Sequence, residues 1–247
     1  MYLDKRISVV IPAKNEAGNI TRIIPGIPEF IDEILLVTSS KEDTTLDFIK
    51  TSAYGDKLIC LIQPNVGKGD AQKKGIKHAS GDYICMIDAD GSVNLNEIEH
   101  MLDLLILKNF DLVKGSRYLK SGGSEDLTNF RSFGNLFLTK ITNVLFSQKW
   151  SDLAYGFVGY KNNSIKELSL HTRPKIRFLP GYNYGDGFEL ETVILTRMSR
   201  MGYKIEEFPS FELKRIEGFS NLRAMRDGFR LLFAIIYEKF SMFKMNH

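Results

Sequence analysis

Short apolar runs alternate with amphipathic segments along the first half of the chain. The apolar runs predict strands at 7–11, 33–38, 57–63, 83–87 and 111–115, and the amphipathic segments predict helices at 17–24, 44–53, 68–79 and 95–107. Strands that are separated by helices form a mostly parallel sheet, because a parallel crossover needs a connection of helical length. We therefore expect an α/β fold, with a Rossmann-like sheet covered by helices on both faces.

The second half of the chain is less regular. The glycine-containing stretch 121–126 is typical of a mobile loop. Further helices are predicted at 133–146 and 188–201, and further strands at 156–161 and 205–213. The last predicted helix, 221–243, carries an apolar stripe made of Leu222, Met225, Phe229, Leu232, Phe233, Ile236 and Phe240. We expect one domain over 1–220 and a C-terminal amphipathic basic helix within 221–247, which packs on the domain or faces a membrane.

Composition restricts the class of protein. Of the 247 residues, 43% are hydrophobic and 26% are charged, a balance that is typical of a globular protein and excludes a disordered chain. Two cysteines, Cys60 and Cys85, are too few for a disulfide scaffold or a closed zinc site. The longest apolar run, 231–237, is much shorter than the roughly 20 residues that span a bilayer, and no export signal precedes the first strand. These observations predict a cytoplasmic location.

Positive charge is concentrated near the C-terminus. The net charge is +3, and residues 214–247 hold seven Lys or Arg against three acids, a local +4, so that the remainder carries −1. This distribution disfavours a nucleic-acid groove and favours an anionic partner such as phosphate or the inner face of a membrane. A solvated helix face that keeps the protein soluble remains the alternative.

Polar side chains follow each predicted strand, and ligands of open α/β sheets bind beyond the carboxyl ends of the strands. Asp88 and Asp90 alternate at the end of the strand 83–87. Two desolvated carboxylates repel each other unless a cation compensates them, and oxygen ligands suit Mg²⁺ or Mn²⁺ bound to a diphosphate. The sequence therefore predicts a metal site here, with an aspartate-rich turn that caps the next helix as the alternative.

Two cations are predicted at the same edge of the sheet. Lys68 begins a helix within a glycine-flanked turn, where backbone amides and the helix dipole favour a phosphate. Arg117 follows the strand 111–115 and has the geometry to bind phosphate oxygens in a bidentate manner. For each of them, a surface salt bridge is the alternative interpretation.

These motifs together resemble those of family-2 glycosyltransferases, most closely the dolichyl- or polyprenyl-phosphate sugar synthases. The resemblance rests on the segments 10–16 (VIPAKNE), 67–69 (GKG), 78–83 (HASGDY), 88–92 (DADGS), 115–117 (GSR), 152–157, 188–191 and 207–209, with Arg215, Gly218 and Ser220 after them. It extends from residue 7 to about residue 220. It implies a GT-A fold, a nucleotide-diphosphate sugar donor and a divalent metal held by Asp88 and Asp90.

The resemblance also assigns site residues. The nucleotide pocket would be lined by Pro12, Ala13, Asn15, Glu16, Ser39, Lys68, Asp88 and Ala89, and Asp90, Arg117, Glu191 and Arg215 would be catalytic. One departure concerns the second strand, where Thr38 and Ser39 stand in place of the family's aspartate pair and Asp43 matches a later aspartate of that motif. Because hydroxyls both donate and accept hydrogen bonds, recognition of the base is expected to be retained but altered.

The acceptor decides what further chemistry is needed. A polyprenyl phosphate is already anionic and needs no general base, whereas the hydroxyl of a membrane-linked glycan does need one. Asp152, Asp186, Glu189 and Glu191 are the candidates, and the resemblance favours Glu191, because its spacing to Gly202 best fits the carboxylate of that family. Two other functions stay open, a sugar-phosphate nucleotidyltransferase and a non-catalytic nucleotide-sugar-binding module.

Overall fold

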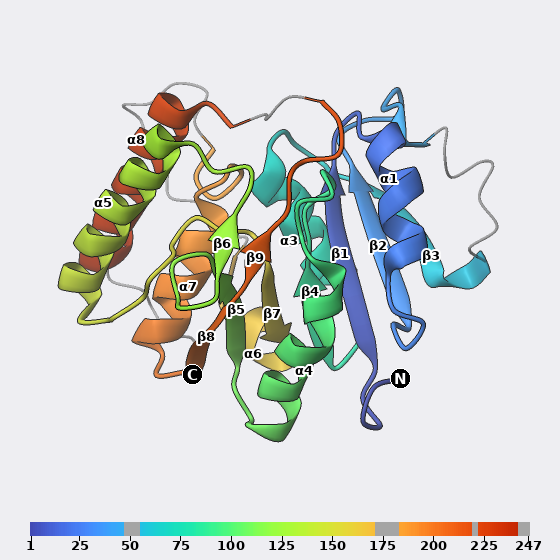
Figure 1. Ribbon diagram of the computed structural model, residues 1–247, viewed down its shortest axis with the longest axis horizontal. Helices are drawn as coiled ribbons and strands as arrows, with labels where there is room; N and C mark the ends of the chain where they lie inside the picture. Colours follow the sequence, from blue (N-terminus) through green and yellow to red (C-terminus); the bar gives the residue numbers. More distant parts are fainter. Residues whose placement is uncertain (47–54, 171–182, 219–221, 242–247) are drawn as a thin grey trace.

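The computed structural model describes residues 1–46, 55–170, 183–218 and 222–241. A seven-stranded sheet with the order β3-β2-β1-β4-β7-β5-β8 forms the centre, and helices cover both of its faces (Figure 1). Its strands are β1 (Ile7–Ala13), β2 (Glu33–Thr38), β3 (Leu58–Ile62), β4 (Tyr83–Met86), β5 (Leu112–Ser116), β7 (Val158–Lys161) and β8 (Ile205–Pro209). A second, two-stranded sheet pairs β6 (Gly123–Ser124) with β9 (Phe211–Glu212). The predicted mostly parallel sheet is confirmed.

Seven of the described helices surround the sheet. They are α1 (Ala17–Ile23), α3 (Lys68–His78), α4 (Ile98–Leu107), α5 (Asn129–Phe146), α6 (Asn162–Lys166), α7 (Leu190–Arg200) and α8 (Ala224–Phe240), with 3₁₀ turns at Ile24–Gly26, Gly55–Lys57 and Leu95–Glu97. Alternation along β1 divides the core into two layers: Val9 and Ile11 pack with α1 and α4, whereas Val10 packs with α3, α6 and α7. In Figure 1, α5 and α8 lie together at the left end of the molecule.

Strand β7 runs antiparallel to both of its neighbours, β4 and β5. The pairs β1–β2, β1–β4, β2–β3 and β5–β8 are parallel, with Ala13 opposite Thr38 at the end of β1 and β2. The carboxyl ends of β1, β2, β4 and β5 therefore meet at one edge of the sheet, at the top of Figure 1. The predicted site residues lie at this edge, the carboxyl edge of the sheet.

Several predicted elements differ from the structure. The stretch 121–126 is not a loop throughout, because Gly123 and Ser124 form β6 and the Ser210 carbonyl accepts a hydrogen bond from Gly123 N. The predicted strand 205–213 is divided into β8 and β9, and α5 begins at Asn129, since Thr128 caps it by accepting from Arg131 N. Helix α6 was not predicted. Most of the predicted helix 44–53 lies outside the described residues.

Helix α8 packs on α7 and α5 through a face that differs from its predicted stripe. Leu231, Ala234 and Ile235 are buried, and Glu238 forms a buried ion pair with Arg197 of α7 at 2.8 Å. The stripe residues Met225, Phe229, Ile236 and Phe240 are exposed instead. Helix α8 therefore packs on the domain through the face next to its apolar stripe, and most of the stripe is in contact with solvent. No helix among the described residues is long and apolar enough to cross a membrane.

Candidate active site

Asp43 organises the ends of β1 and β2. One oxygen of this buried carboxylate accepts hydrogen bonds from Asn15 N (2.9 Å), Thr45 N (3.0 Å) and the Thr45 hydroxyl (2.6 Å). The other accepts from Ser39 N (3.2 Å) and the Ser39 hydroxyl (2.8 Å). Burial works to raise the pKa of Asp43, but these donors outweigh it and lower that pKa below its usual value. Asp43 is thus a fixed negative charge that joins two loops of the site.

Some of the predicted nucleotide-binding residues lie at the end of β1, and others lie in the loops after β1 and β2. Pro12 and Ala13 are buried within β1, so they contribute backbone and small surfaces rather than exposed side chains. Asn15 adopts a left-handed conformation (φ 57°), which turns the chain away from the sheet. The Ser39 hydroxyl donates to Asp43, so that its remaining capacity is to accept a hydrogen bond.

Three charged side chains from different elements meet beside β4. Lys68 Nζ lies 2.7 Å from Asp88 Oδ1 and 2.9 Å from Glu191 Oε1, and the Gln72 side-chain amide donates to the same glutamate oxygen at 2.7 Å. The Lys68 ammonium also lies 5.5 Å from the centre of the Phe188 ring. Ala89, the residue after Asp88, is buried. The structure therefore brings Lys68, Asp88 and Glu191 into one cluster.

A close backbone approach holds Lys68 in place. Gly67 adopts φ 121°, and a Cβ at this position would lie 2.0 Å from the Asp186 carbonyl oxygen. Only glycine lets the first turn of α3 pack this tightly against the turn before α7. The same carbonyl accepts a hydrogen bond from Asp70 N at 3.2 Å. The glycine-flanked lysine of the sequence is therefore placed by contacts with a turn that is distant in the chain.

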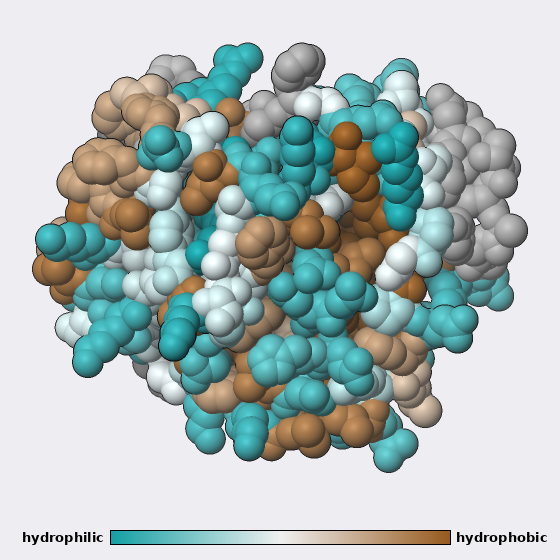
Figure 2. All heavy atoms as spheres, viewed as in Figure 1, coloured by the Kyte–Doolittle hydropathy of each residue, from teal (hydrophilic) through white to brown (hydrophobic). Residues whose placement is uncertain are grey.

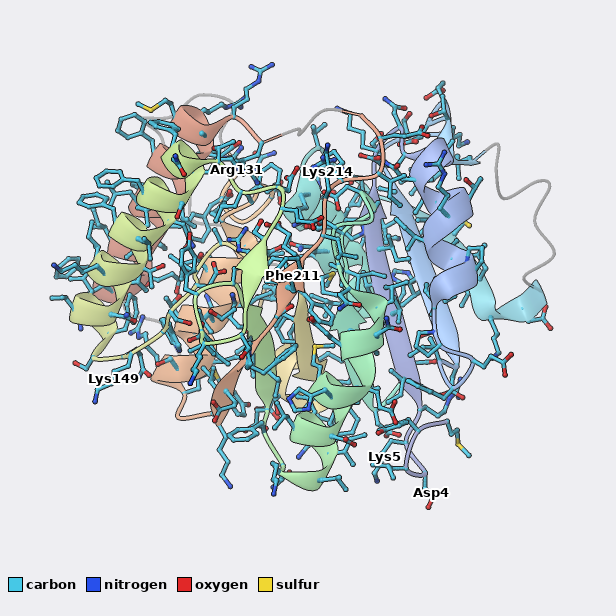
Figure 3. The ribbon with its side chains drawn as sticks, in the orientation of Figure 1. Asp4, Lys5, Arg131, Lys149, Phe211 and Lys214 are labelled. Carbon is cyan, nitrogen blue, oxygen red and sulfur yellow. The ribbon has the colours of Figure 1, made fainter. Side chains whose placement is uncertain are left out.

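Arg215 reaches the acidic pair from the segment after β9. Its guanidinium lies 2.7 Å from Asp90 Oδ2, while Asp90 Oδ1 accepts from Ser92 N at 3.0 Å. The segment 213–217, the strap, is bonded to the loop after β4 through Leu213 N to Ser92 O (2.8 Å) and Ile216 N to Asp90 O (3.0 Å). Figure 3 labels Phe211 and Lys214 at the start of this path across the carboxyl edge.

The packing of the strap depends on a second glycine. Gly91 has φ 79°, and a Cβ there would lie 2.3 Å from the Ile216 side chain. At the far end of the strap, Glu217 pairs with Arg22 of α1 at 2.6 Å. Arg215 is therefore fixed opposite Asp90 by backbone bonds on both sides. Ser220, the last residue of the resemblance, lies outside the described residues.

The carboxylates at this edge carry an excess of negative charge. Burial is the largest cause that raises the pKa of Asp88 to about 6, with Asp90 and Glu191 adding to it and Lys68 opposing it. Burial also raises the pKa of Glu16, against the lowering effects of its hydrogen bond with Asn19 and of Arg215. For Lys68, burial works to lower the pKa, but Asp88 and Glu191 outweigh it and raise that pKa, so this ammonium stays charged.

The donor set fits a hard divalent cation. Asp88 and Asp90 supply carboxylate oxygens at a partly exposed edge, and the raised pKa of Asp88 shows that a further positive charge there would be stabilising. No group of three or more His, Cys, Asp or Glu able to enclose a metal occurs among the described residues. Two carboxylates suffice for Mg²⁺ or Mn²⁺ when water and substrate phosphates complete the shell.

Arg117 is held from two sides directly after β5. Its guanidinium binds the buried Asp152 through Nε (2.7 Å) and Nη2 (3.0 Å), and Glu212 of β9 through Nη1 (3.1 Å). Burial works to lower the pKa of Arg117, but both carboxylates outweigh it and raise that pKa. The predicted bidentate partner is therefore an internal carboxylate, and the guanidinium is fixed in orientation by it.

A cavity of about 270 Å³ lies between α5, α7 and α8 beside these residues. Its polar lining consists of Arg117, Arg131, Asn135, Glu191, Thr192 and Asp227. Its other walls are mainly apolar and include Leu127, Phe130, Phe137, Leu138, Phe188, Leu222, Met225, Phe229, Leu231 and Leu232. The cavity thus combines two arginines and two carboxylates with a mainly apolar lining. Glu191 belongs both to this cavity and to the cluster with Lys68 and Asp88.

The structure distinguishes between the four carboxylates considered as a base. Asp152 is bound to Arg117, Asp186 to Lys73 at 2.5 Å, and Glu189 to Arg230 and the backbone of Gly185 and Gly187. These three are fully buried. Glu191 alone among the four lines the cavity. The role of Glu191 as a base stays a prediction.

Four contributors to the site were missed from the sequence: Gln72, Arg131, Asn135 and Phe188. Gln72 lies one helical turn after Lys68, a spacing that places both on one face of α3, so this signal was available. Arg131 and Asn135 lie on α5, whose polar residues gave no motif. Phe188 stands in a quoted motif but had no assigned role.

A mostly parallel α/β sheet with an acidic pair, a lysine and an arginine at its carboxyl edge is typical of proteins that bind a nucleotide through its phosphates. Residues 8–169 match the family model for glycosyl transferase family 2. The chain belongs to this family, and it is a glycosyltransferase whose donor is a nucleotide sugar. The resemblance seen in the sequence is confirmed.

Two curated relatives extend the comparison. The chain is 24% identical over 238 residues to the glycosyltransferase AglJ of Haloferax volcanii, covering 94% of this chain and 71% of that protein. It is 30% identical over 177 residues to the dolichyl-phosphate β-glucosyltransferase ALG5C of Trichomonas vaginalis, covering 64% of this chain and 52% of that protein. The match thus spans about half the length of the Trichomonas protein.

Solved structures share the fold. Glucosyl-3-phosphoglycerate synthase from Mycobacterium tuberculosis, in complex with Mn²⁺ and UDP-glucose, superposes with a TM-score of 0.67 at 18% identity, covering 96% of this chain and 79% of that chain. A mycobacterial protein superposes with a TM-score of 0.69 at 14% identity, covering 95% of this chain and 75% of that chain. The expected GT-A fold is confirmed.

Proposed function

We propose that this protein transfers a sugar, with inversion at the anomeric carbon, from a nucleoside-diphosphate sugar to a polyprenyl phosphate. The observation that carries the proposal is the shared wall between two neighbouring sites. Glu191 lies 2.9 Å from Lys68 at the acidic edge and also lines the cavity that contains Arg117. A donor bound at the acidic edge and an acceptor phosphate beside Arg117 would therefore approach each other.

The donor end is built for a diphosphate. Asp88 and Asp90 would hold Mg²⁺ or Mn²⁺, which would neutralise charge on the departing nucleoside diphosphate. Lys68 and Arg215 present positive charge at the same place, so that they stabilise the negative charge that develops on the leaving group. Ser39, oriented by Asp43, accepts a hydrogen bond from an N–H of the base. The related mycobacterial synthase, crystallised with Mn²⁺ and UDP-glucose, supports this donor class.

The acceptor end suits an amphiphilic molecule. Arg131, partly exposed and paired with Asp126, would contact the phosphate beside Arg117, which lines the cavity while bound to Asp152 and Glu212. The apolar walls from α5 and α8 would accommodate the first prenyl units. A phosphate oxygen is anionic at neutral pH, so it attacks the anomeric carbon without a general base. The name of the Trichomonas relative, a dolichyl-phosphate glucosyltransferase, supports the same acceptor class.

A glycan hydroxyl is the second candidate acceptor. The observation that favours it is the position of Glu191, whose Oε1 is bound by Lys68 and Gln72, so that Oε2 can take up a proton. Family membership favours both of these glycosyltransferase reactions over the sugar-phosphate nucleotidyltransferase considered from the sequence.

An acceptor with a polyprenyl chain resides in a membrane. We therefore also propose that the protein acts peripherally at the inner face of a membrane. The basic C-terminal region supports this location, because Arg223, Arg226 and Lys239 are exposed there.

The test is a transfer assay with Mn²⁺ and separate UDP, GDP, CDP and TDP sugars. Each donor is combined with a polyprenyl phosphate in detergent, with the corresponding prenol, or with a glycan. We expect release of nucleoside diphosphate and formation of an acid-labile phosphate-linked sugar with the polyprenyl phosphate alone. Turnover with the glycan alone would move the assignment to the second candidate. Silence with all acceptors, together with metal-dependent nucleotide binding, would favour the non-catalytic binding module.

A matched pair of variants probes the acceptor end. Arg131→Ala removes a cavity cation that is partly exposed, and Arg6→Ala removes an exposed arginine before β1. We expect the first variant to raise KM for the lipid phosphate by roughly tenfold, since a hydrogen bond to a charged group contributes about 1.5–3 kcal/mol. The second should leave KM for that acceptor unchanged.

A further inference from the structure

Helix α5 buries three polar side chains beside Phe146 and the partly buried Leu138, Ile141 and Leu145, and it exposes a row of large apolar ones. Its buried residues are Asn135, Thr139, Thr142 and Phe146. Its exposed residues include Phe130, Phe133, Leu136, Phe137 and Val144, and Phe133 is 72% exposed. A helix at the surface of a soluble domain normally exposes polar side chains instead. Tan and brown spheres over α5 mark this surface at the left of Figure 2.

The inward polar residues of α5 have specific partners. Asn135 Nδ2 donates to Asp152 at 2.8 Å, and Asn135 Oδ1 accepts from Ala154 N at 3.0 Å. The Thr139 hydroxyl accepts from Leu153 N at 3.2 Å. These bonds attach α5 to the segment that holds Arg117. The orientation of α5 is therefore fixed, and its aromatic residues face outward for a reason other than loose packing.

Helix α8 continues the same surface. It packs beside α5 and exposes Met225, Phe229, Ile236 and Phe240, the last of them at 75%. Phe130 and Phe137 from α5, and Met225 and Phe229 from α8, also line the cavity. Four of the exposed apolar residues of the two helices therefore also belong to the cavity proposed for the acceptor.

The exposed charges on these two helices are mostly positive, and the acids nearby are Glu125 and Asp126 before α5 and Asp227 in α8. Helix α5 contains no Asp or Glu, and the exposed cations on the two helices and their flanks are Lys140, Lys149, Arg223, Arg226 and Lys239. In α8, Asp227 accepts from Arg223 N at 2.7 Å and Glu238 is buried against Arg197. Figure 3 shows Arg131 and Lys149 toward opposite ends of α5. An apolar surface within a ring of cations complements an anionic lipid headgroup layer.

We propose that the exposed faces of α5 and α8 form one docking surface that inserts into the interfacial layer of an anionic bilayer. A second copy of the chain fits poorly, because a symmetric contact would bring these cations against each other. Only the role of the cavity rests on the proposed function, and the cavity would open toward the lipid. The prenyl chain of the acceptor would then enter without crossing water.

The experiment measures cosedimentation of the full chain with vesicles that contain neither donor nor acceptor. Vesicles of phosphatidylcholine with phosphatidylglycerol are compared with phosphatidylcholine alone, at low and at high salt. We expect binding to the anionic vesicles at low salt and release at high salt, since the attraction is screened. Absence of binding to the anionic vesicles would overturn the proposal.

Paired variants separate the two helices from the rest of the surface. Phe133→Ser on α5 and Phe240→Ser on α8 are each compared with Leu107→Ser, which changes an exposed leucine at the end of α4. We expect each phenylalanine variant to weaken vesicle binding about fivefold, and the leucine variant to have no effect. Binding that depends on Phe240 but not on Phe133 would overturn the composite surface, since α8 alone would then carry it.

A charge pair tests the ring of cations. Arg226→Glu and Lys108→Glu make the same change in net charge, at the docking surface and beyond α4 respectively. We expect at least about a tenfold loss of vesicle binding for the first variant only. Thermal unfolding of each variant checks that the fold is retained, and sedimentation velocity checks for a dimer. A dimer that Phe133→Ser dissociates, without vesicle binding, would overturn the proposal in favour of self-association.

Failure of docking and failure of the proposed function give different results. Transfer to a detergent-solubilised polyprenyl phosphate without vesicle binding would reject the docking surface and retain the acceptor. Vesicle binding without transfer to any polyprenyl phosphate would retain the surface and reject the acceptor.

Discussion

The guanidinium of Arg215 lies 2.7 Å from the carboxylate of Asp90, which joins the strap after β9 to the loop after β4. Two backbone hydrogen bonds fix the geometry of this pair, one from Leu213 N to Ser92 O and one from Ile216 N to Asp90 O. Arg215 is therefore a preorganised cation at the acidic edge, and such groups stabilise developing charge without rearrangement.

Replacement of Arg215 should damage catalysis far more than replacement of Arg226, an exposed arginine of α8. We expect Arg215→Ala to lower kcat/KM by about a hundredfold, because it removes positive charge from the leaving group, and Arg226→Ala to leave it within about twofold. Both are assayed with an acceptor in detergent, so that contact with a bilayer does not limit the rate. Equal losses would show that Arg215 has no special place in the reaction.

Removal of Asp90 should abolish turnover and preserve the fold. We expect Asp90→Ala to lower kcat by at least about a hundredfold, since one of the two proposed metal ligands is lost. Asp90→Asn keeps an acceptor for Ser92 N and serves as the matched control for the turn. Both variants should show the far-ultraviolet circular dichroism of the wild type. Substantial activity of either variant at saturating Mn²⁺ would contradict the metal assignment.

Metal binding should weaken as the pH falls through about 6. Burial, with help from Asp90 and Glu191, raises the pKa of Asp88 to about 6, so that its carboxyl gains a proton below this pH and ceases to be a ligand. We expect the Kd for Mn²⁺ to rise by about tenfold per pH unit below that point and to change little above it. Calorimetric titration of Mn²⁺ across this range measures it. A flat profile through pH 6 would mean that Asp88 does not bind the metal.

Replacement of Glu191 discriminates between the two acceptors. Glu191→Gln keeps the shape of the side chain but removes the ability to accept a proton. For a glycan hydroxyl we expect kcat to fall by about 10²–10⁴-fold, the usual contribution of a general base. For a polyprenyl phosphate we expect only a small fall in kcat, caused by the altered contact between residue 191 and Lys68. A pH profile of kcat distinguishes loss of a base from loss of that contact.

Replacement of Ser39 should affect donor binding and leave the chemical step intact. Ser39→Ala removes the hydroxyl that donates to Asp43 and would accept from the base. We expect KM for the donor to rise by about fivefold with kcat unchanged, since this contact is equal in the ground and transition states. Ser40→Ala, one residue further along the same loop, is the control. An unchanged KM in Ser39→Ala would leave the base-recognising residue unassigned.

Local patterns in the sequence were sufficient to predict five strands of the sheet and the positions of most residues at the donor edge. Apolar runs predicted the strands β1 to β5, and helical periodicity predicted the helices between them, because both patterns are local properties of the chain. Asp88, Asp90 and Lys68 were predictable since each follows or precedes an element whose end the sequence marks. Membership of a glycosyltransferase family was also visible, as its motifs are short and contiguous.

Contacts between distant segments depend on the tertiary fold. The pairing of Arg215 with Asp90 depends on the course of the strap, and the insertion of β7 between β4 and β5 depends on contacts that no local pattern records. Burial likewise distinguishes Glu191 from Asp152, Asp186 and Glu189, because the sequence gives no information on the burial or the partners of a carboxylate. The outward aromatic face of α5 followed from the same cause. The inward asparagine and threonines are held by Asp152, Ala154 and Leu153, and hydrogen bonds to residues of another segment decide which side of a helix is buried.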